Sequence, residues 1–232
     1  CSRLAVLPSL FYLSEVAKGN TDEEKIKTKF KQKFGLFYDD FMLLSLANKV
    51  GKEIDYTIQN PSKYLLYNDP FLGRFDWTVN EGDAQKYADS AIIISQAAER
   101  SKNYGYVFNS IAKLCDTLSI KADLGVRLRV AYKEGDKDTL KSIANNDIPL
   151  CIEKLNAFYD AFSYQWHKEN KPHGFDVSDI RLGGVMTRLS HCADRLEDYI
   201  NGDIDHIEEL EEVLLDMRTP ASADYGVKGE CR

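Results

Sequence analysis

The sequence lacks any apolar run close to the roughly 20 residues that a membrane-spanning helix needs. It also lacks an excess of positive charge, because its 30 Lys and Arg residues are outnumbered by 37 Asp and Glu residues and the formal net charge is −7. Proteins that bind nucleic acids through the phosphates carry clustered Lys and Arg. We therefore expect a partner that is neither a membrane nor a nucleic acid.

Cysteine and histidine are few and show no metal-binding pattern. The cysteines are odd in number and no two have the C-x-x-C spacing: Cys1, Cys115, Cys151, Cys192 and Cys231. No two histidines are four residues apart: His167, His173, His191 and His206. We expect no disulfide framework, no metal site and no cofactor. Reduced thiols, three of them as small buried apolar groups in helices, are typical of a cytoplasmic protein.

Proline and glycine are also scarce, with six and 14 residues, so long helices can run without interruption. Hydrophobic residues make up 44% of the chain, which is enough for a sizeable core. Apolar residues at spacings of three and four are typical of helices with one buried face. This pattern predicts helices over 2–18, 21–33, 39–48, 83–103, 106–133, 137–145, 147–170, 176–201 and 204–216.

Three local signals refine these helices. Thr21 and Glu24 have the spacing of a capping box, in which each side chain bonds a free backbone N–H of the first turn. Asp147 is expected to cap a long helix that has Pro149 in its first turn. Gly183-Gly184 lies inside a predicted helix at a cost of about 1 kcal/mol for each glycine. A close approach of a neighbouring helix or loop would explain that cost.

Long helices joined by short loops favour antiparallel neighbours. We therefore predict a mainly α protein with a bundle of four to five long helices over 83–216. A small helical hairpin (21–48) and an irregular aromatic connector (49–82) precede the bundle, and an irregular tail (217–232) follows it. The helix in residues 1–20 is so apolar that we expect it to pack on something that this chain contains only in part.

The connector holds the best candidate for a binding site. Its segment 63–76 combines aromatic rings with amide, carboxylate and guanidinium groups, as sugar sites do: Tyr64, Tyr67, Asn68, Asp69, Arg74 and Asp76. From these we predict Tyr67, Asn68, Asp69 and Arg74 as substrate-binding residues. No residue is predicted to be catalytic. The acidic run Glu208–Glu212 is typical of a solvated helix face.

The same segment has a structural interpretation. Asn68-Asp69-Pro70 is a typical turn sequence, and the connector can simply fill a gap between domains. The residues that would fill the gap are Tyr64, Leu66, Phe71 and Phe75. The sequence alone leaves both interpretations open.

Several stretches resemble bacterial family 20 glycoside hydrolases of the branch that has a helical C-terminal domain. They are Lys63-Tyr-Leu-Leu-Tyr-Asn-Asp-Pro-Phe-Leu-Gly-Arg-Phe-Asp76, residues 171–184 with Arg188-Leu189, and residues 204–212. Residues 1–13 resemble the last helix of the family's catalytic (β/α)₈ barrel, so residues 1–20 would be a remnant of that barrel. The family's adjacent Asp-Glu pair would then lie upstream of Cys1, and we expect the chain to be an inactive fragment.

The resemblance implies a parent enzyme that removes terminal N-acetylglucosamine or N-acetylgalactosamine. In this family the substrate's own acetamido group attacks the anomeric carbon, with overall retention. The implied partners are the upstream catalytic barrel, a second copy in a homodimer, and N-acetylglucosamine-containing glycans reached through the parent. The role implied for this chain is to stabilise the barrel and to support dimerisation. The alternative is a free-standing helical module that binds a protein or a carbohydrate.

Overall fold

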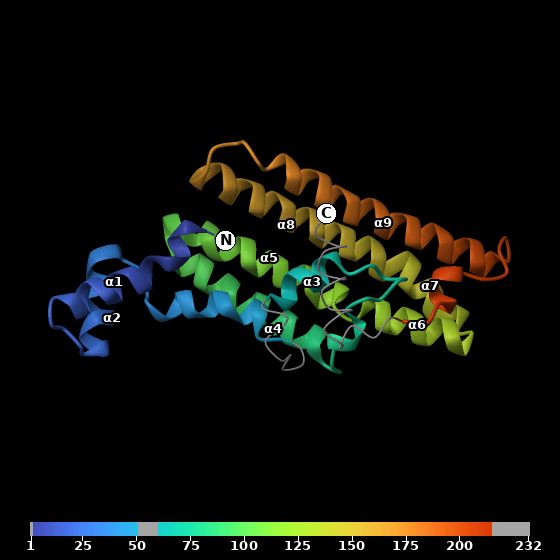
Figure 1. Ribbon diagram of the computed structural model, residues 1–232, viewed down its shortest axis with the longest axis horizontal. Coiled ribbons are helices and arrows are strands. Elements are labelled where there is room, and N and C mark those ends of the chain that lie inside the picture. The colour runs from blue at the N-terminus through green and yellow to red at the C-terminus, as the bar shows by residue number, and fades with distance from the viewer. Residues whose placement is uncertain (1, 51–59, 215–232) are drawn as a thin grey trace.

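Long antiparallel helices dominate the structure, a computed structural model that describes residues 2–50 and 60–214 (Figure 1). The α-helices are α1 (Leu7–Ala17), α2 (Glu23–Phe34), α3 (Pro61–Tyr67), α4 (Asp83–Arg100), α5 (Gly105–Lys121), α6 (Leu124–Glu134), α7 (Lys137–Ser142), α8 (Ile148–Glu169), α9 (Asp176–Asn201) and α10 (Glu208–Glu211). Short 3₁₀ helices cover Arg3–Val6, Asp39–Asn48, Asp76–Thr78 and Lys102–Tyr104. The predicted mainly α class and helical bundle are confirmed.

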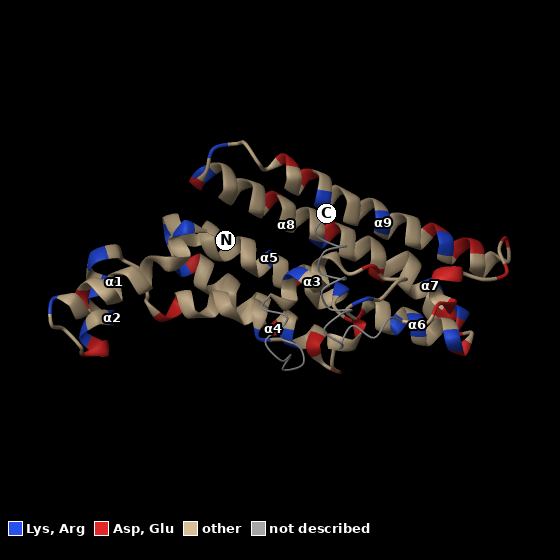
Figure 2. Ribbon diagram, in the orientation of Figure 1, with Lys and Arg blue, Asp and Glu red and all other residues tan. Residues whose placement is uncertain are grey.

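Four long helices form the bundle in a continuous row. Helix α5 packs against α4 on one side and α8 on the other, and α8 also packs against α9. In Figure 2 the ribbons of these helices are mostly uncharged, whereas acidic and basic turns gather near α6, α7 and the end of α9. The apolar face of α9 is buried at Leu182, Leu189, Cys192 and Leu196. Apolar periodicity therefore located the bundle correctly.

The start of α5 lies very close to the end of α4. A Cβ atom added at Gly105 would lie 2.5 Å from the backbone oxygen of Ala98. Only glycine fits at such a distance, which explains why a residue with low helix propensity begins a 17-residue helix. Tyr87 of α4 and Phe108 and Leu118 of α5 are fully buried in the core.

The helix predicted over 106–133 is two helices. Asp123, with φ −106° and ψ 2°, leaves the helical path between α5 and α6. Its carboxylate accepts a hydrogen bond from Arg127 Nε at 3.0 Å. The prediction was wrong because the glycine near this break, Gly125, lies two residues past Asp123 in the first turn of α6 and was not taken as a helix end. The break makes Lys121 the last residue of α5.

The predicted cap at Asp147 is also wrong. Residues 137–169 are helical throughout, because a π-helical turn (Ile143–Asp147) joins α7 to α8. Asp147 has helical dihedral angles, and its carboxylate accepts a hydrogen bond from Arg127 Nη1 at 2.5 Å. Pro149 does lie in the first turn of α8, as predicted.

Three smaller expectations also need correction. Asp22, not Thr21, caps α2, and its carboxylate accepts a hydrogen bond from the backbone N–H of Lys25 at 3.2 Å. The predicted helix 39–48 is a 3₁₀ helix, and it packs against α4 and α5. Of the acidic helix predicted over 204–216, the described residues 204–214 are regular only in α10. The predicted tail 217–232 lies outside the described residues, as do Cys1 and Cys231.

The three described cysteines behave as predicted. Cys115, Cys151 and Cys192 are free and fully buried in α5, α8 and α9. Burial raises the pKa of the Cys115 thiol to about 12. Within residues 2–50 and 60–214, no helix is both long and apolar enough to cross a membrane.

Helices α1 and α2 pair at one end of the bundle (Figure 1). The Phe11 ring of α1 packs edge-on against Phe30 and Phe34 of α2, with centroid distances of 5.5 and 5.6 Å. Glu15 adds a polar link, because its carboxylate lies 2.7 Å from Lys29 Nζ and 2.9 Å from Lys18 Nζ. The hydrogen bond from Lys29, followed by those from Lys18 and Asn20, lowers the pKa of Glu15 to about 2.

The lowered pKa of Glu15 predicts that the stability of the protein depends on pH. Because the folded state holds the pKa of Glu15 near 2, below the ordinary 4.5, its contribution is complete above pH 4.5. The contribution disappears as the pH falls through 2. We expect Glu15→Gln to lower the urea midpoint at pH 7 and to lower it less at pH 3. Glu24→Gln, whose side chain is 84% exposed, is the control and should show no such difference. An equal effect of Glu15→Gln at both pH values would contradict the prediction.

Candidate functional site

Residues Pro61–Tyr67 in the middle of the connector form α3, which corrects the expectation of an irregular segment over 49–82. Pro61 lies in the first turn of α3, and Leu65 and Leu66 point into the core. Residues 51–59 of the connector lie outside the described residues. The chain then turns sharply at Asp69, whose Oδ1 accepts the backbone N–H groups of Phe71 and Leu72 at 2.9 and 3.0 Å. Asp69 thereby shapes the loop that follows α3.

Asn68 and Asp76 close this loop from inside. Both side chains are only 7% exposed. Asn68 Nδ2 donates to Asp76 Oδ1 at 2.8 Å, and Asn68 Oδ1 accepts the backbone N–H of Phe75 at 3.1 Å. The second oxygen, Asp76 Oδ2, has no hydrogen-bond partner among the described residues. Burial raises the pKa of Asp76 above its ordinary value, against the opposing effect of Asn68.

Two cations from the bundle bind the backbone of the connector. Lys121 Nζ, at the end of α5, donates to the carbonyl oxygens of Leu65 at 3.2 Å and Asn68 at 2.5 Å. Arg129 of α6 donates to the carbonyl oxygen of Phe71 and, at 3.1 Å, to that of Leu210. Since burial disfavours a charged ammonium, the pKa of Lys121 is lowered. The connector is therefore held on α5 and α6 through main-chain contacts.

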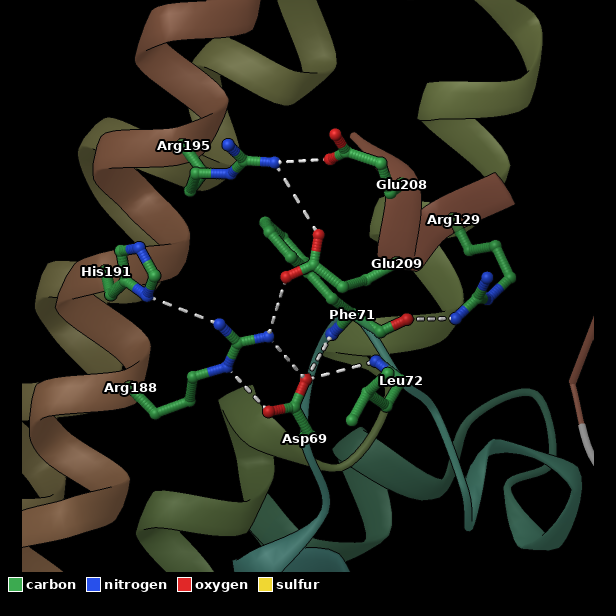
Figure 3. Close-up of polar contacts among 9 residues, drawn as sticks. All are labelled: Asp69, Phe71, Leu72, Arg129, Arg188, His191, Arg195, Glu208 and Glu209. Atoms are coloured by element: carbon green, nitrogen blue, oxygen red, sulfur yellow. Dashed lines mark hydrogen bonds and ion pairs between the residues drawn. The ribbon is translucent and has the colours of Figure 1, made fainter. Parts of the chain in front are cut away.

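An ion-pair network, shown in Figure 3, ties the connector to α9 and α10. Arg188 Nε donates to Asp69 Oδ2 at 2.6 Å, and Arg188 Nη2 lies 3.5 Å from Glu209 Oε1. Arg195, two turns further along α9, lies 2.8 Å from Glu208 and 3.6 Å from Glu209. We call these five residues the Arg188 network. It joins segments that are more than 100 residues apart in the sequence.

Electrostatics favour the charged pair at the centre of this network. Burial raises the pKa of Asp69, but the hydrogen bonds from Arg188 and from the backbone N–H of Leu72 outweigh it and leave the pKa below its ordinary value. The hydrogen bond to Asp69 likewise raises the pKa of Arg188. The Arg188 guanidinium also lies over the Phe71 ring, 5.3 Å from its centroid. Arg188 is thus held by a carboxylate and an aromatic face of the same loop.

A cavity of about 200 Å³ lies between the connector and α9. Its walls are formed by Tyr67, Asn68, Asp69, Lys121, Gly184 and Arg188, among others. This volume is below the roughly 300–1,000 Å³ of typical pockets for drug-sized ligands. The cavity can take a single small group, but not a whole oligosaccharide.

Comparison with known families now places the chain. Residues 39–228 match the family model described as the glycoside hydrolase 20C C-terminal domain. The chain belongs to this family. The comparison with curated proteins finds no match. The 20C match begins after α1 and α2, so these two helices precede the family domain and the bundle lies within it.

Membership in the 20C family confirms the resemblance found in the sequence and makes the chain part of a glycoside hydrolase. The structure brings together three of the four predicted substrate-binding residues, because Tyr67, Asn68 and Asp69 line the cavity. Arg74 is half-buried and lies outside the cavity wall. The polar groups of Asn68 and Asp69 are engaged within the protein. A substrate-binding role for these four residues stays a prediction.

Many contacts of the connector in this 20C domain agree with the interpretation that it fills a gap in the protein. Phe71 and Phe75 are buried, and the Tyr64 ring lies 4.9 Å from that of Phe75. The turn at Asn68–Pro70 forms as its sequence indicates. The connector therefore fills the space between α3, α5 and α9 with aromatic rings and closes it with polar bonds.

Sequence reasoning missed the cations that complete this region of the 20C domain. Lys121 follows Cys115 and Leu118 on the apolar side of α5, and a lysine on such a stripe is the signal that could have revealed it. The acidic run was interpreted as a solvated face, yet Glu208 and Glu209 bind arginines of α9. Within the described ranges, no group of three or more His, Cys, Asp or Glu side chains could hold a metal ion.

The expected close approach at Gly183-Gly184 is wrong. Among the described residues, a Cβ atom added at either glycine would meet no atom within 4 Å. Gly184 instead lines the cavity, whereas Gly183 does not. The missing side chain at residue 184 keeps that wall of the cavity open.

Proposed function

We propose that this chain is the non-catalytic C-terminal part of an exo-acting β-N-acetylhexosaminidase. Family membership supports a glycoside hydrolase parent. The resemblance of the connector and of residues 171–184 to family 20 enzymes supports terminal N-acetylglucosamine or N-acetylgalactosamine as the substrate. Hydrolysis would then be retaining and substrate-assisted. The catalytic acids would lie on a barrel that precedes this chain.

The observation that carries the proposal is an apolar stripe that begins at Val6, the last residue of the first 3₁₀ helix, and continues along α1. Val6, Leu10 and Leu13 are 53%, 59% and 64% exposed, and they lie on one face at spacings of four and three. The opposite face of α1 is already buried, because Phe11 packs against α2. A row of large exposed apolar side chains on one helix marks a contact surface. We name Val6, Leu10 and Leu13 the α1 stripe.

The catalytic barrel is the partner that fits the α1 stripe. The family match starts at residue 39, so α1 lies on the side of the chain where a preceding domain would join. The start of the chain is also anchored to the far end of α8, since Ser2 Oγ donates to Glu169 Oε1 at 2.5 Å and Arg3 N donates to Glu169 Oε2 at 2.8 Å. A barrel seated on α1 would therefore be held in a fixed position relative to the bundle, which would stabilise it.

The activity test compares the 232-residue chain with a longer polypeptide in which the catalytic barrel precedes this chain. A chromogenic N-acetylglucosaminide should be hydrolysed by the longer polypeptide and not by the 232-residue chain. Stoichiometric turnover by the chain alone would overturn the proposal. The alternative of a free-standing carbohydrate-binding module predicts saturable calorimetric binding of N-acetylglucosamine or chitobiose, which the proposal does not.

The α1 stripe gives the second test. In the longer polypeptide, Leu10→Asp with Leu13→Asp should speed thermal inactivation, because burial of a leucine contributes about 1.5–3 kcal/mol and part of that would be lost for each. Ile180→Asp is the matched control, since Ile180 is 74% exposed on α9, away from the stripe. Equal inactivation rates for the two variants would count against barrel docking at α1.

A further inference from the structure

A second cavity, of about 480 Å³, opens at the corner where α4 meets α5, beside the last turns of α8. This volume lies within the roughly 300–1,000 Å³ of typical pockets for small ligands. Its polar lining consists of two lysines, two asparagines and two tyrosines: Lys102, Lys168, Asn103, Asn109, Tyr106 and Tyr164. Such a lining is suited to a ligand that is rich in acceptor oxygens. We call this space the corner cavity.

The two amides of the corner cavity are available to a ligand. Asn103 and Asn109 are exposed, and within residues 2–50 and 60–214 their side chains make no hydrogen bond. An amide offers two donors on its nitrogen and an acceptor oxygen, so it can bind the hydroxyl groups of a sugar. Asn68 of the connector, by contrast, has both ends of its amide engaged within the protein. Hydroxyl-binding groups are therefore free at the corner cavity.

Lys168 places a cation in the corner cavity. Its Nζ lies 4.4 Å from the centroid of the Tyr106 ring and 5.3 Å from that of the Tyr164 ring. The same Nζ donates to the Tyr164 hydroxyl at 3.3 Å. Because an ammonium carries three donors, this contact leaves two for a ligand. The two tyrosines therefore position the ammonium without using all of its hydrogen-bonding capacity.

One carboxylate lies near this place, that of Glu169, and it interacts with the Tyr106 hydroxyl. Glu169 also accepts hydrogen bonds from Ser2 Oγ at 2.5 Å and from Arg3 N at 2.8 Å. It is not among the residues that line the corner cavity. In the part of the chain that the structure describes, neither lysine of the corner cavity has an ion-pair partner. Glu169 is thus bound to the start of the chain and does not occupy the corner cavity.

Lys102 has an unusual backbone conformation. Its φ is +49°, and it is the one non-glycine residue with positive φ among residues 2–50 and 60–214. Such a conformation strains a residue that has a side chain, and strain of this kind gathers at functional sites. Glycine would fit the backbone better. Since no ion pair within the described residues explains the lysine, binding of an anion by its ammonium would explain it.

We propose that the corner cavity binds an acidic sugar, a single sugar ring that carries a carboxylate or a phosphate group. The ammoniums of Lys102 and Lys168 bind the anionic group, and the amides of Asn103 and Asn109 bind the ring hydroxyls. Tyr164, which is 59% exposed, forms the aromatic side of the site. N-acetylglucosamine and chitobiose carry no anionic group and are not ligands of this site. The site does not depend on the catalytic barrel, so its failure would leave the function proposed above intact.

The test uses the 232-residue chain, labelled with ¹⁵N, and two sugars that differ in one group, glucuronate and glucose. Glucuronate should shift the side-chain amide resonances of Asn103 and Asn109 in a saturable manner. Glucose should bind at least about tenfold more weakly, because it lacks the charge-assisted hydrogen bonds. Glucose 6-phosphate shows which anionic group is preferred, and tighter binding of either acid than of glucose supports the site. The proposal is overturned if neither acid gives saturable shifts at these amides, or if glucose binds as tightly as both.

A variant at Lys102 separates binding from folding. Glycine adopts a φ of +49° without steric cost, so Lys102→Gly should unfold at the same temperature as the original chain or at a higher one. It should bind the preferred acid about tenfold more weakly, since it lacks one ammonium. Lys141→Gln is the matched control, because Lys141 is an exposed lysine of α7 without an ion pair among the described residues, and it should bind as the original chain does. Equal affinities of the two variants for that acid would overturn the proposal.

Discussion

Arg188→Ala is expected to lower the free energy of unfolding by about 2–4 kcal/mol, because removal of one partner of a buried ion pair leaves the other charge unpaired. Arg188 and Asp69 are 27% and 22% exposed, so the expected loss lies at or just below the usual range for fully buried pairs. The same change also removes the guanidinium from the Phe71 ring. Urea unfolding followed by circular dichroism gives the measurement.

Arg195→Ala is the matched control for this prediction. Arg195 lies on the same helix, and its closest carboxylate, Glu208, is 66% exposed. Exposed ion pairs contribute about 0–1 kcal/mol. The loss for Arg195→Ala should therefore stay under about 1 kcal/mol. Comparable losses of unfolding free energy for the two arginine variants would contradict the prediction that the Arg188–Asp69 pair contributes more than an exposed ion pair.

The central role of Arg188 also shows what the sequence could and could not predict. The apolar stripe of α9 is periodic over seven turns, so burial of Leu182, Leu189 and Leu196 followed from spacing alone. The same pattern places Arg188 at the edge of the buried stripe. It contains no information about Asp69, which lies 119 residues away. Ion-pair partners at that separation are set by tertiary packing.

The helix boundaries show a similar division. Helix α9 was predicted with its ends nearly correct, because a glycine follows it and its pattern is unbroken. The break at Asp123 and the π-helical turn before α8 were missed. Gly125 lies two residues after Asp123 and Pro149 two residues after the π-helical turn, but neither gave the correct boundary. In both places Arg127 supplies a contact, to Asp123 and to Asp147. Local propensity does not encode the contact of Arg127 with Asp147, which lies 20 residues away.

The composition of segment 63–76 drew attention to it as a candidate site, but composition could not assign a role to its side chains. Tyr67, Asn68 and Asp69 line one cavity, and their substrate-binding role stays a prediction. The amide and carboxylate groups that suggested sugar binding are equally suited to bind the loop's own backbone. The sequence could not decide between these uses, because the deciding cations come from α5, α6 and α9.

Asn68→Ala is expected to destabilise the protein by about 3 kcal/mol, since each buried polar group left without a partner costs about 1–3 kcal/mol. Two such groups would result, the backbone N–H of Phe75 and Oδ1 of Asp76. The raised pKa of Asp76 indicates that burial already disfavours this carboxylate. A loss of 3 kcal/mol corresponds to a fall in Tm of about 6–12 °C for a domain of this size.

Asn156→Ala is the control, because Asn156 is exposed on α8 and, among the described residues, its amide donates only to the Ile152 carbonyl oxygen, at 3.0 Å. Its effect should stay within about 0.5 kcal/mol. The comparison also separates the two roles considered for Asn68. A residue that held only a substrate could be replaced without loss of stability, and a Tm unchanged in Asn68→Ala would restore that role. A large fall in Tm would instead show that the amide is required to close the connector, because no bound sugar is present in the measurement.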